Sequence, residues 1–103
     1  GVKRLDRIYD GQRCAIAGLV IARQHPETAM GFVFLYLEDE TGHCQGIVHP
    51  ELWESLRSQL RSRAVIVSGR VQRLRGFKTL VVESVLPLEA LVSKETEMAY
   101  FVR

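Results

Sequence analysis

One helical pattern lies in the middle of a sequence whose other apolar segments have the composition of β-strands. Leu52, Leu56 and Leu60 recur every four residues after Pro50, a residue that suits the first helical position because its missing N–H would be unpaired there anyway. Five strand-like segments flank this helix, three before it and two after it, at residues 12–24, 32–38, 43–48, 64–72 and 77–86. We expect the apolar stripe of the helix to plug the open end of a small barrel rather than to bind a partner.

The first strand-like segment is too long to remain straight in such a barrel. Residues 12–24 contain Gly18 near their centre. A glycine inside a strand pattern indicates a bulge or a sharp bend, and small barrels need one where a long strand passes from one side of the sheet to the other. The sequence therefore predicts a bulge or bend in this strand at Gly18.

Three strands, one helix and a final hairpin are the order of the OB-fold, an all-β, five-stranded Greek-key barrel with one helix between strands 3 and 4. Another small all-β barrel with an added helix remains an alternative. We assign residues 1–11 to a lead-in segment, 12–87 to the OB-fold domain and 88–103 to a C-terminal tail. The spacing of Leu88, Leu91 and Val92 makes a short helix conceivable in this tail.

Length and composition restrict the possible functions. A chain of 103 residues suits one domain and leaves no room for a large active site. Cys14 and Cys44 lie in apolar runs, so we interpret both as core thiols of a protein in the reducing cytoplasm. The sequence has no Cys/His cluster, no signal peptide and no apolar run of transmembrane length, so we expect no metal, no cofactor and no membrane partner. A start at Gly1 indicates a piece of a longer protein.

Basic residues are concentrated in one part of the chain. Between Arg57 and Lys78 there are seven basic residues and no acidic one, although the formal net charge of the whole chain is only +2. Such asymmetry indicates a polyanionic ligand. A solvated helix end followed by a polar loop would produce the same pattern, and we expect Arg57, Arg61 and Arg63 to belong to that second case.

The second strand predicts a surface for stacking bases. Alternation places Val33, Leu35 and Leu37 on one face and Phe32, Phe34 and Tyr36 on the other. The aliphatic set fits the barrel interior, which leaves the aromatic rings outside, where they could stack on bases. Two alternatives stay open: the aromatic residues form the core and the faces are reversed, or Phe32 covers only the preceding loop.

Polar residues around this strand complete the predicted binding site. Gln45 shares a face of the third strand with His43, and its amide could hydrogen-bond a base edge. We expect phosphate contacts from the first loop and from the loop between the last two strands, through Arg23, Gln24, Arg73, Arg75 and Lys78. Catalysis finds little support, because the adjacent Glu38, Asp39 and Glu40 diverge and the serines have no evident base.

The stretch from Gly18 to Gly42 resembles the OB domain near the C-terminus of bacterial C-family DNA polymerases, the polymerase III alpha subunits. The loop Arg-Gln-His-Pro-Glu-Thr-Ala-Met-Gly, Arg23 to Gly31, most resembles the error-prone branch, which acts in damage-induced mutagenesis. The resemblance covers about residues 11–87. His25 and Met30 replace residues that are often basic in the family, which weakens the charge of this loop.

The resemblance implies a domain that contacts the single-stranded template and does no chemistry itself, in a parent chain that is a DNA-directed nucleotidyltransferase. In related anticodon-binding OB domains a phenylalanine stacks on a base and a glutamine contacts one, and the matching positions here are Phe34 and Gln45. The partners it implies are single-stranded DNA and the other domains of the parent polymerase, with the chain itself monomeric. A tRNA anticodon-binding domain and a protein-interaction barrel remain as alternatives.

Overall fold

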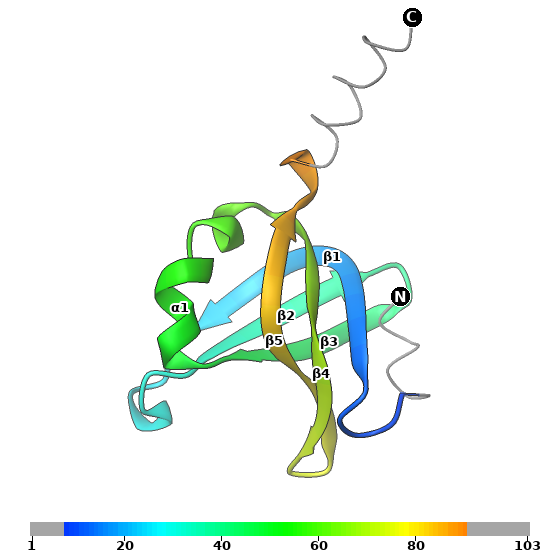
Figure 1. Ribbon diagram of the computed structural model, residues 1–103, viewed down its shortest axis with the longest axis vertical. Helices are drawn as coiled ribbons and strands as arrows, with labels where there is room; N and C mark the ends of the chain where they lie inside the picture. The colour runs from blue at the N-terminus through cyan, green and yellow to red at the C-terminus, as the bar shows by residue number, and fades with distance from the viewer. Residues whose placement is uncertain (1–7, 91–103) are drawn as a thin grey trace, which may run out of the picture.

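The computed structural model describes residues 8–90, which form a barrel of five strands with one α-helix (Figure 1). The strands are β1 (Arg13–Gln24), β2 (Val33–Asp39), β3 (Gly42–Val48), β4 (Ala64–Leu74) and β5 (Phe77–Pro87). Helix α1 (Pro50–Leu56) lies between β3 and β4, and two short 3₁₀ turns, η2 (Glu27–Ala29) and η3 (Gln59–Arg61), follow β1 and α1. The predicted tail helix lies largely outside the described residues.

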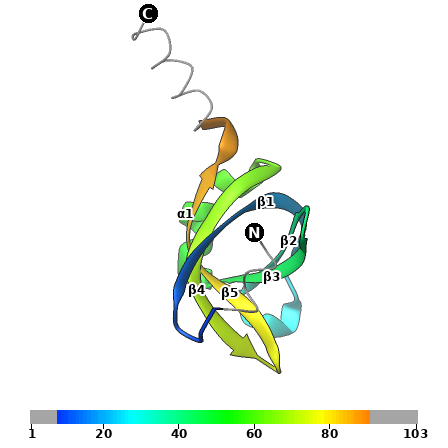
Figure 2. The same cartoon turned by 90° about the vertical axis from the view of Figure 1, so that its right-hand side faces the viewer.

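The strands close into a barrel in the order β1-β2-β3-β5-β4 (Figure 2). Every neighbouring pair is antiparallel except β3 and β5, which run parallel over Gln45–Ile47 and Thr79–Val81. The predicted all-β barrel with a helix between the third and fourth strands is therefore confirmed. Within the described residues, no helix is long and apolar enough to cross a membrane.

Strand β1 belongs to both sides of the barrel. Arg13 to Leu19 pair with β4, and Leu19 to Gln24 pair with β2, with an irregularity of register between Val20 and Ala22. Gly18 lies at the crossing point, where a Cβ atom would come within 2.9 Å of the carbonyl oxygen of Glu38. The absence of a side chain at residue 18 therefore lets β1 pass close to β2 as it changes partners.

The barrel interior is aliphatic and comes from alternate residues of the strands. Val33, Leu35 and Leu37 on β2 are at most 1% exposed, so the predicted inner face is confirmed and the reversed barrel is excluded. The rest of the buried hydrophobic core comes from all the other strands and the helical segment: Ile16, Cys44, Val48, Leu56, Leu60, Val65, Val67, Val71, Leu80 and Val82. Burial of this continuous apolar surface is the main stabilising contribution to the fold.

The helical segment closes one end of the barrel, but in two pieces. Leu56 on α1 and Leu60 on η3 are buried, and Leu52 and Trp53 pack against the core. The predicted apolar stripe is confirmed, although α1 ends at Leu56 and does not continue to Arg61. A tighter 3₁₀ turn, with Ser62 already extended, brings Leu60 into the core and leads the chain into β4.

Residues 8–12 pack against the C-terminal half of β4 and the N-terminal half of β5, near the hairpin that joins these strands. The Nζ atom of Lys78 donates a hydrogen bond of 2.8 Å to the carbonyl oxygen of Ile8, and Ile8 packs against the core. The backbone N–H of Gly11 donates to Val71 O, and Val71 N donates to Gln12 O. Part of the predicted lead-in segment is therefore attached to the barrel.

Candidate nucleic-acid interface

Aromatic and amide side chains lie together on the outer face of β2 and β3. Tyr36 is directly opposite Gln45, and Phe34 is opposite Ile47, in the antiparallel register of these strands. All four residues are partly exposed, whereas Leu35 between the two aromatic residues is completely buried. The predicted outward direction of Phe34 and Tyr36 is confirmed, and the two rings are available to a ligand from the solvent side.

Strand β1 adds a polar group beside these rings. Gln24 is opposite Phe34 in the β1–β2 register, and its Oε1 accepts a hydrogen bond of 3.5 Å from the hydroxyl group of Tyr36. Gln24 remains exposed to solvent, so its amide group is accessible to a ligand. Gln24, Phe34, Tyr36 and Gln45 therefore form one continuous surface, which we call the aromatic face, and which offers flat rings together with hydrogen-bond donors and acceptors.

The pairing of β3 with β5 places residues that the sequence did not indicate next to the aromatic face. Gln45 is opposite Thr79 in the parallel register, and Thr79 is opposite Gln72 on β4. Thr79 is only 1% exposed, so the row consists of two accessible glutamine side chains, Gln45 and Gln72, with a buried threonine between them. The sequence could not indicate this row, because the pairing of β3 with β5 joins segments about thirty residues apart and leaves no local pattern.

Phe77 is an exposed aromatic residue that the sequence analysis did not name as a site residue. It begins β5, shares the phase of Thr79 and is 74% exposed. The sequence predicts Phe77 only as the first residue of the last strand-like segment. Its position directly after a turn was the available signal, since a residue at the tip of a hairpin lies beyond the barrel core.

The β4–β5 hairpin carries two predicted arginines. Its turn consists of Arg75 and Gly76, both with positive φ, at 51° and 84°. The Arg73 side chain donates to the carbonyl oxygen of Gly76 at 3.2 Å, and the Arg75 side chain is exposed. Both views place the tip of this hairpin and the η2 segment at the same lower end of the molecule (Figures 1 and 2). Arg23 is exposed near the end of β1, just before the η2 segment.

The loop between β1 and β2 is held against α1 through aromatic contacts. His25 lies edge-on to Trp53 with ring centroids 5.0 Å apart, and Phe32 lies 4.9 Å from His49. Gly31 has a φ of 89° and lies so close to Pro50 that a Cβ atom would be 3.0 Å from the proline ring. Phe32 therefore packs on the residue that precedes the helix, in agreement with the interpretation that it covers the loop.

Two other predicted site residues already make contacts within the protein. Lys78 shares the inward phase of Leu80, and its amino group binds the carbonyl oxygen of Ile8. His43 Nε2 lies 3.4 Å from Glu38 Oε1, at the end of β3 away from α1. The structure thus brings together Gln24, Phe34, Tyr36 and Gln45, whereas Lys78 lies among residues that hold the N-terminal segment.

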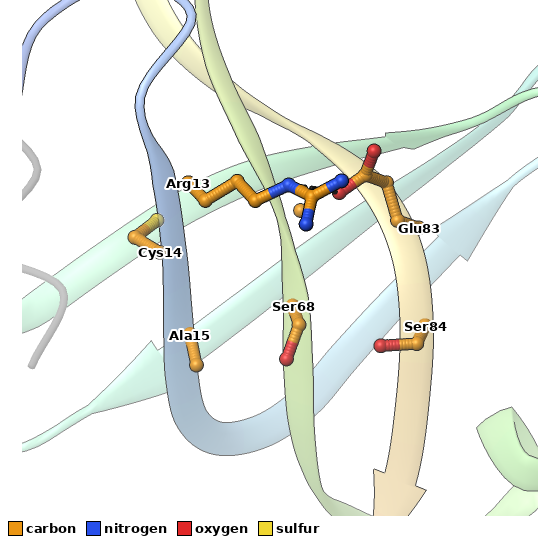
Figure 3. A pocket seen from close by; sticks show the side chains of 7 residues that line it. Arg13, Cys14, Ala15, Ser68, Glu83 and Ser84 are labelled. Carbon is orange, nitrogen blue, oxygen red and sulfur yellow. Dashed lines mark ion pairs between the residues drawn. The ribbon is translucent and has the colours of Figure 1, made fainter.

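A shallow hollow on the wall formed by β1, β4 and β5 is lined by Arg13, Cys14, Ser68, Glu83 and Ser84, among others (Figure 3). The side chains of Arg13 and Arg70 both reach the carboxylate of Glu83, at 3.6 and 3.7 Å, so their charges are partly compensated. Cys14 is half-buried beside them, and burial raises the pKa of its thiol. Residues 8–90 contain no group of three or more His, Cys, Asp or Glu side chains arranged to hold a metal ion.

A closed five-stranded barrel with its helix between β3 and β4, and an exposed aromatic face on β2 and β3, defines the OB-fold class of binding domains. The family model of the OB-fold nucleic acid binding domain matches residues 14–88. The chain belongs to this family.

The matched relatives are much longer proteins. The chain is 42% identical over 87 residues to an error-prone DNA polymerase of Corynebacterium glutamicum, an overlap that covers 84% of the chain and 8% of that polymerase. It is 39% identical over 100 residues to an error-prone DNA polymerase of Anaeromyxobacter dehalogenans, which covers 96% of the chain and 9% of the polymerase. The resemblance to the OB domain of error-prone C-family polymerases is confirmed, and the chain spans less than a tenth of these relatives' length.

A solved structure gives an independent comparison. The asparaginyl-tRNA synthetase of Pyrococcus horikoshii superposes with a TM-score of 0.63 and 26% sequence identity, over 75% of this chain and 20% of the synthetase chain. The same barrel is therefore found in a protein whose substrate is a tRNA.

Proposed function

We propose that this chain is the single-stranded DNA-binding domain of an error-prone DNA polymerase III alpha subunit and contacts the template during damage-associated DNA synthesis. The observation that supports the proposal is the aromatic face, where Phe34 and Tyr36 are partly exposed beside Gln45. Stacking on an aromatic ring contributes about 1–3 kcal/mol per base and tolerates any base. Such tolerance suits a domain that has to accept whatever template sequence arrives.

The phosphates of the strand would be neutralised by arginines on two loops beside the aromatic face. Arg23 lies beside the β1–β2 loop, and Arg73 and Arg75 lie on the β4–β5 hairpin. In this role the chain binds and orients the strand, and nucleotidyl transfer takes place in other domains of the parent chain. We propose that the chain acts in the cytoplasm and as a monomer. Gln45 and Gln24 would contact base edges, and His43 would approach the strand only from the margin.

A tRNA ligand is the competing proposal, and the similarity to an asparaginyl-tRNA synthetase favours it. The two proposals differ in one chemical group, since the 2′-hydroxyl lets a protein distinguish RNA from DNA. Fluorescence anisotropy with oligo-dT and with oligo-U of equal length, on both this chain and the full-length parent, compares them. We expect tighter binding of oligo-dT, with an affinity that falls as salt increases. Tighter binding of oligo-U would instead support the tRNA role.

The variant Phe34→Leu tests the aromatic face directly. It keeps an apolar side chain of similar size and removes the ring, so we expect oligo-dT binding to weaken about tenfold, equivalent to one lost stacking contact of about 1.4 kcal/mol. Chemical-shift changes during an oligo-dT titration of the unmodified chain should fall on Phe34, Tyr36, Gln45 and Phe77.

The matched control is Leu86→Ala, which removes an exposed apolar side chain from the β5 surface beside β4. It should leave the oligo-dT affinity unchanged. If Phe34→Leu binds as tightly as the unmodified chain while both remain folded, the aromatic face is not the binding site. Binding that is insensitive to salt would favour the third possibility, a protein-interaction barrel.

A further inference from the structure

The outer surface of β1, β4 and β5 is formed by small and apolar residues. Ala17 on β1 is opposite Ile66 on β4, which is opposite Leu86 on β5. The next rows in the same registers are Ala15, Ser68 and Ser84 on one side, and Leu19 with Ala64 on the other. None of these eight residues is charged. We call this surface the alanine face, and it belongs to a different part of the barrel wall from the aromatic face.

Large apolar groups on the alanine face are exposed to water. Leu19 is 42% exposed and Leu86 is 44% exposed, and the neighbouring Ile21 is 48% exposed. A hollow of about 470 Å³ is lined by Ala17, Gly18, Leu19, Ala64 and Leu88 together with the acidic run Glu38–Glu40. Apolar surface bounded by charge is typical of a protein contact, and the alanine side chains let another backbone approach closely.

We propose that the alanine face is the surface by which this domain docks on the rest of its parent chain. The relatives indicate how much of such a parent lies elsewhere, because the chain covers only 8% and 9% of two of them. Leu88, near the end of the described residues, lines the hollow, so the last described part of the chain lies at the edge of this face. The docked surface would be apolar at its centre and basic opposite Glu38–Glu40.

The proposed arrangement separates two tasks on one small barrel. Docking through β1, β4 and β5 leaves Phe34, Tyr36 and Gln45 facing away from the contact, available to a strand. This inference depends on the longer parent proposed above but not on the identity of the nucleic acid. Its test therefore measures access to the alanine face rather than binding of DNA.

A thiol placed at residue 17 reports on that access. We would make Ala17→Cys together with Cys14→Ala, both in this chain and in the full-length protein to which it belongs. Alkylation by a maleimide, followed by mass spectrometry of the peptide that contains residue 17, gives the rate. Because an interface core excludes solvent, we expect the introduced thiol to react at least about tenfold more slowly in the full-length protein.

The control is Ser58→Cys in the same background, in the exposed turn between α1 and η3, which should react at the same rate in both forms. Equal rates for Ala17→Cys in the two forms would overturn the proposal. Slow alkylation already in the short chain would also overturn the proposal. If that slow rate depends on protein concentration, a second copy of the chain covers the face. If it does not, other residues of the same chain cover it.

A second variant measures the consequence of docking. Ala17→Arg places a charge on the exposed side of β1, so the short chain should keep its thermal unfolding midpoint and its oligo-dT affinity. In the full-length protein the charge would have to enter the interface, and we expect trypsin to cut the segments bordering the domain about fivefold faster. Unchanged proteolysis of the full-length variant would contradict docking through this face.

Discussion

Among the glycines of the barrel wall, Gly69 is the one at which an added side chain would be most crowded. It lies on β4 where the register with β5 is irregular, between Ser68 and Gly69, and it is buried opposite Val82. A Cβ atom at this position would overlap the carbonyl oxygen of Val81, which belongs to the backbone and has little freedom to move. The bulge in β5 and the missing side chain at Gly69 are therefore two parts of one local arrangement.

We expect Gly69→Ala to lower the free energy of unfolding by about 3 kcal/mol, at the upper end of the cost of overpacking. Gly11→Ala is the matched control, because Gly11 has a φ of 84° but no atom within 4 Å of the added methyl group. Its only cost is the left-handed backbone, about 1 kcal/mol. Urea unfolding of both variants measures the difference, and equal losses would show that crowding at Gly69 is relieved by a shift of β5.

The β4–β5 hairpin combines a structural compromise with a proposed binding role. Its two-residue turn has positive φ at both positions, the geometry of a type I′ turn, in which asparagine followed by glycine is preferred. Arg75 occupies the asparagine position at φ 51°, where a long side chain is less favourable. The placement of an arginine here is explained if its charge contacts the phosphates of the bound strand.

The variant Arg75→Asn separates these two effects. It should raise the free energy of unfolding by about 0.5 kcal/mol because it suits the turn. It should also reduce the magnitude of the slope of log affinity against log salt by about 0.7, the value for one lost contact to single-stranded nucleic acid. Thermal unfolding and oligo-dT binding at several salt concentrations provide both numbers. A more stable hairpin with an unchanged slope would exclude Arg75 from the binding site.

At the scale of the whole molecule, the closed barrel isolates Cys44 from solvent. Its side chain points inward from β3 and is 8% exposed. Burial, with smaller contributions from the charge of Asp39 and from Cys14, raises the pKa of the Cys44 thiol from 9.0 to about 12. The reactive thiolate is therefore almost absent in the native state near neutral pH, and alkylation of Cys44 requires the barrel to open.

We expect Cys44 alkylation at about pH 8 to be slower than in the urea-unfolded chain by at least about a thousandfold, the smallest equilibrium constant usual for a stable domain. The factor should match the equilibrium constant from urea unfolding. Cys14, which is half-buried, should react much faster through local motion of β1. Equal rates for the two cysteines would mean that β3 separates from the barrel without global unfolding.

Prediction from the sequence succeeded where one element carried the whole signal. The alternation of Val33, Leu35 and Leu37 identified the buried face of β2, and Gly18 marked the point where β1 changes partners. Contacts between distant elements were not accessible in this way. Lys78, which the sequence predicts to contact phosphate, also donates to the carbonyl oxygen of Ile8, seventy residues away in the chain, and no local pattern indicated that contact.

The sequence by itself determined the order of the elements, the aliphatic interior and the outward direction of Phe34 and Tyr36, because burial alternates along a strand with a period of two. Only the tertiary structure decided which of the outward residues lie together. The parallel pairing of β3 with β5 brings Gln72 and Thr79 beside Gln45, and the closure of β1 onto β4 creates the alanine face. Both of these surfaces result from pairing between strands that are far apart in the sequence, and no local periodicity indicates such pairing.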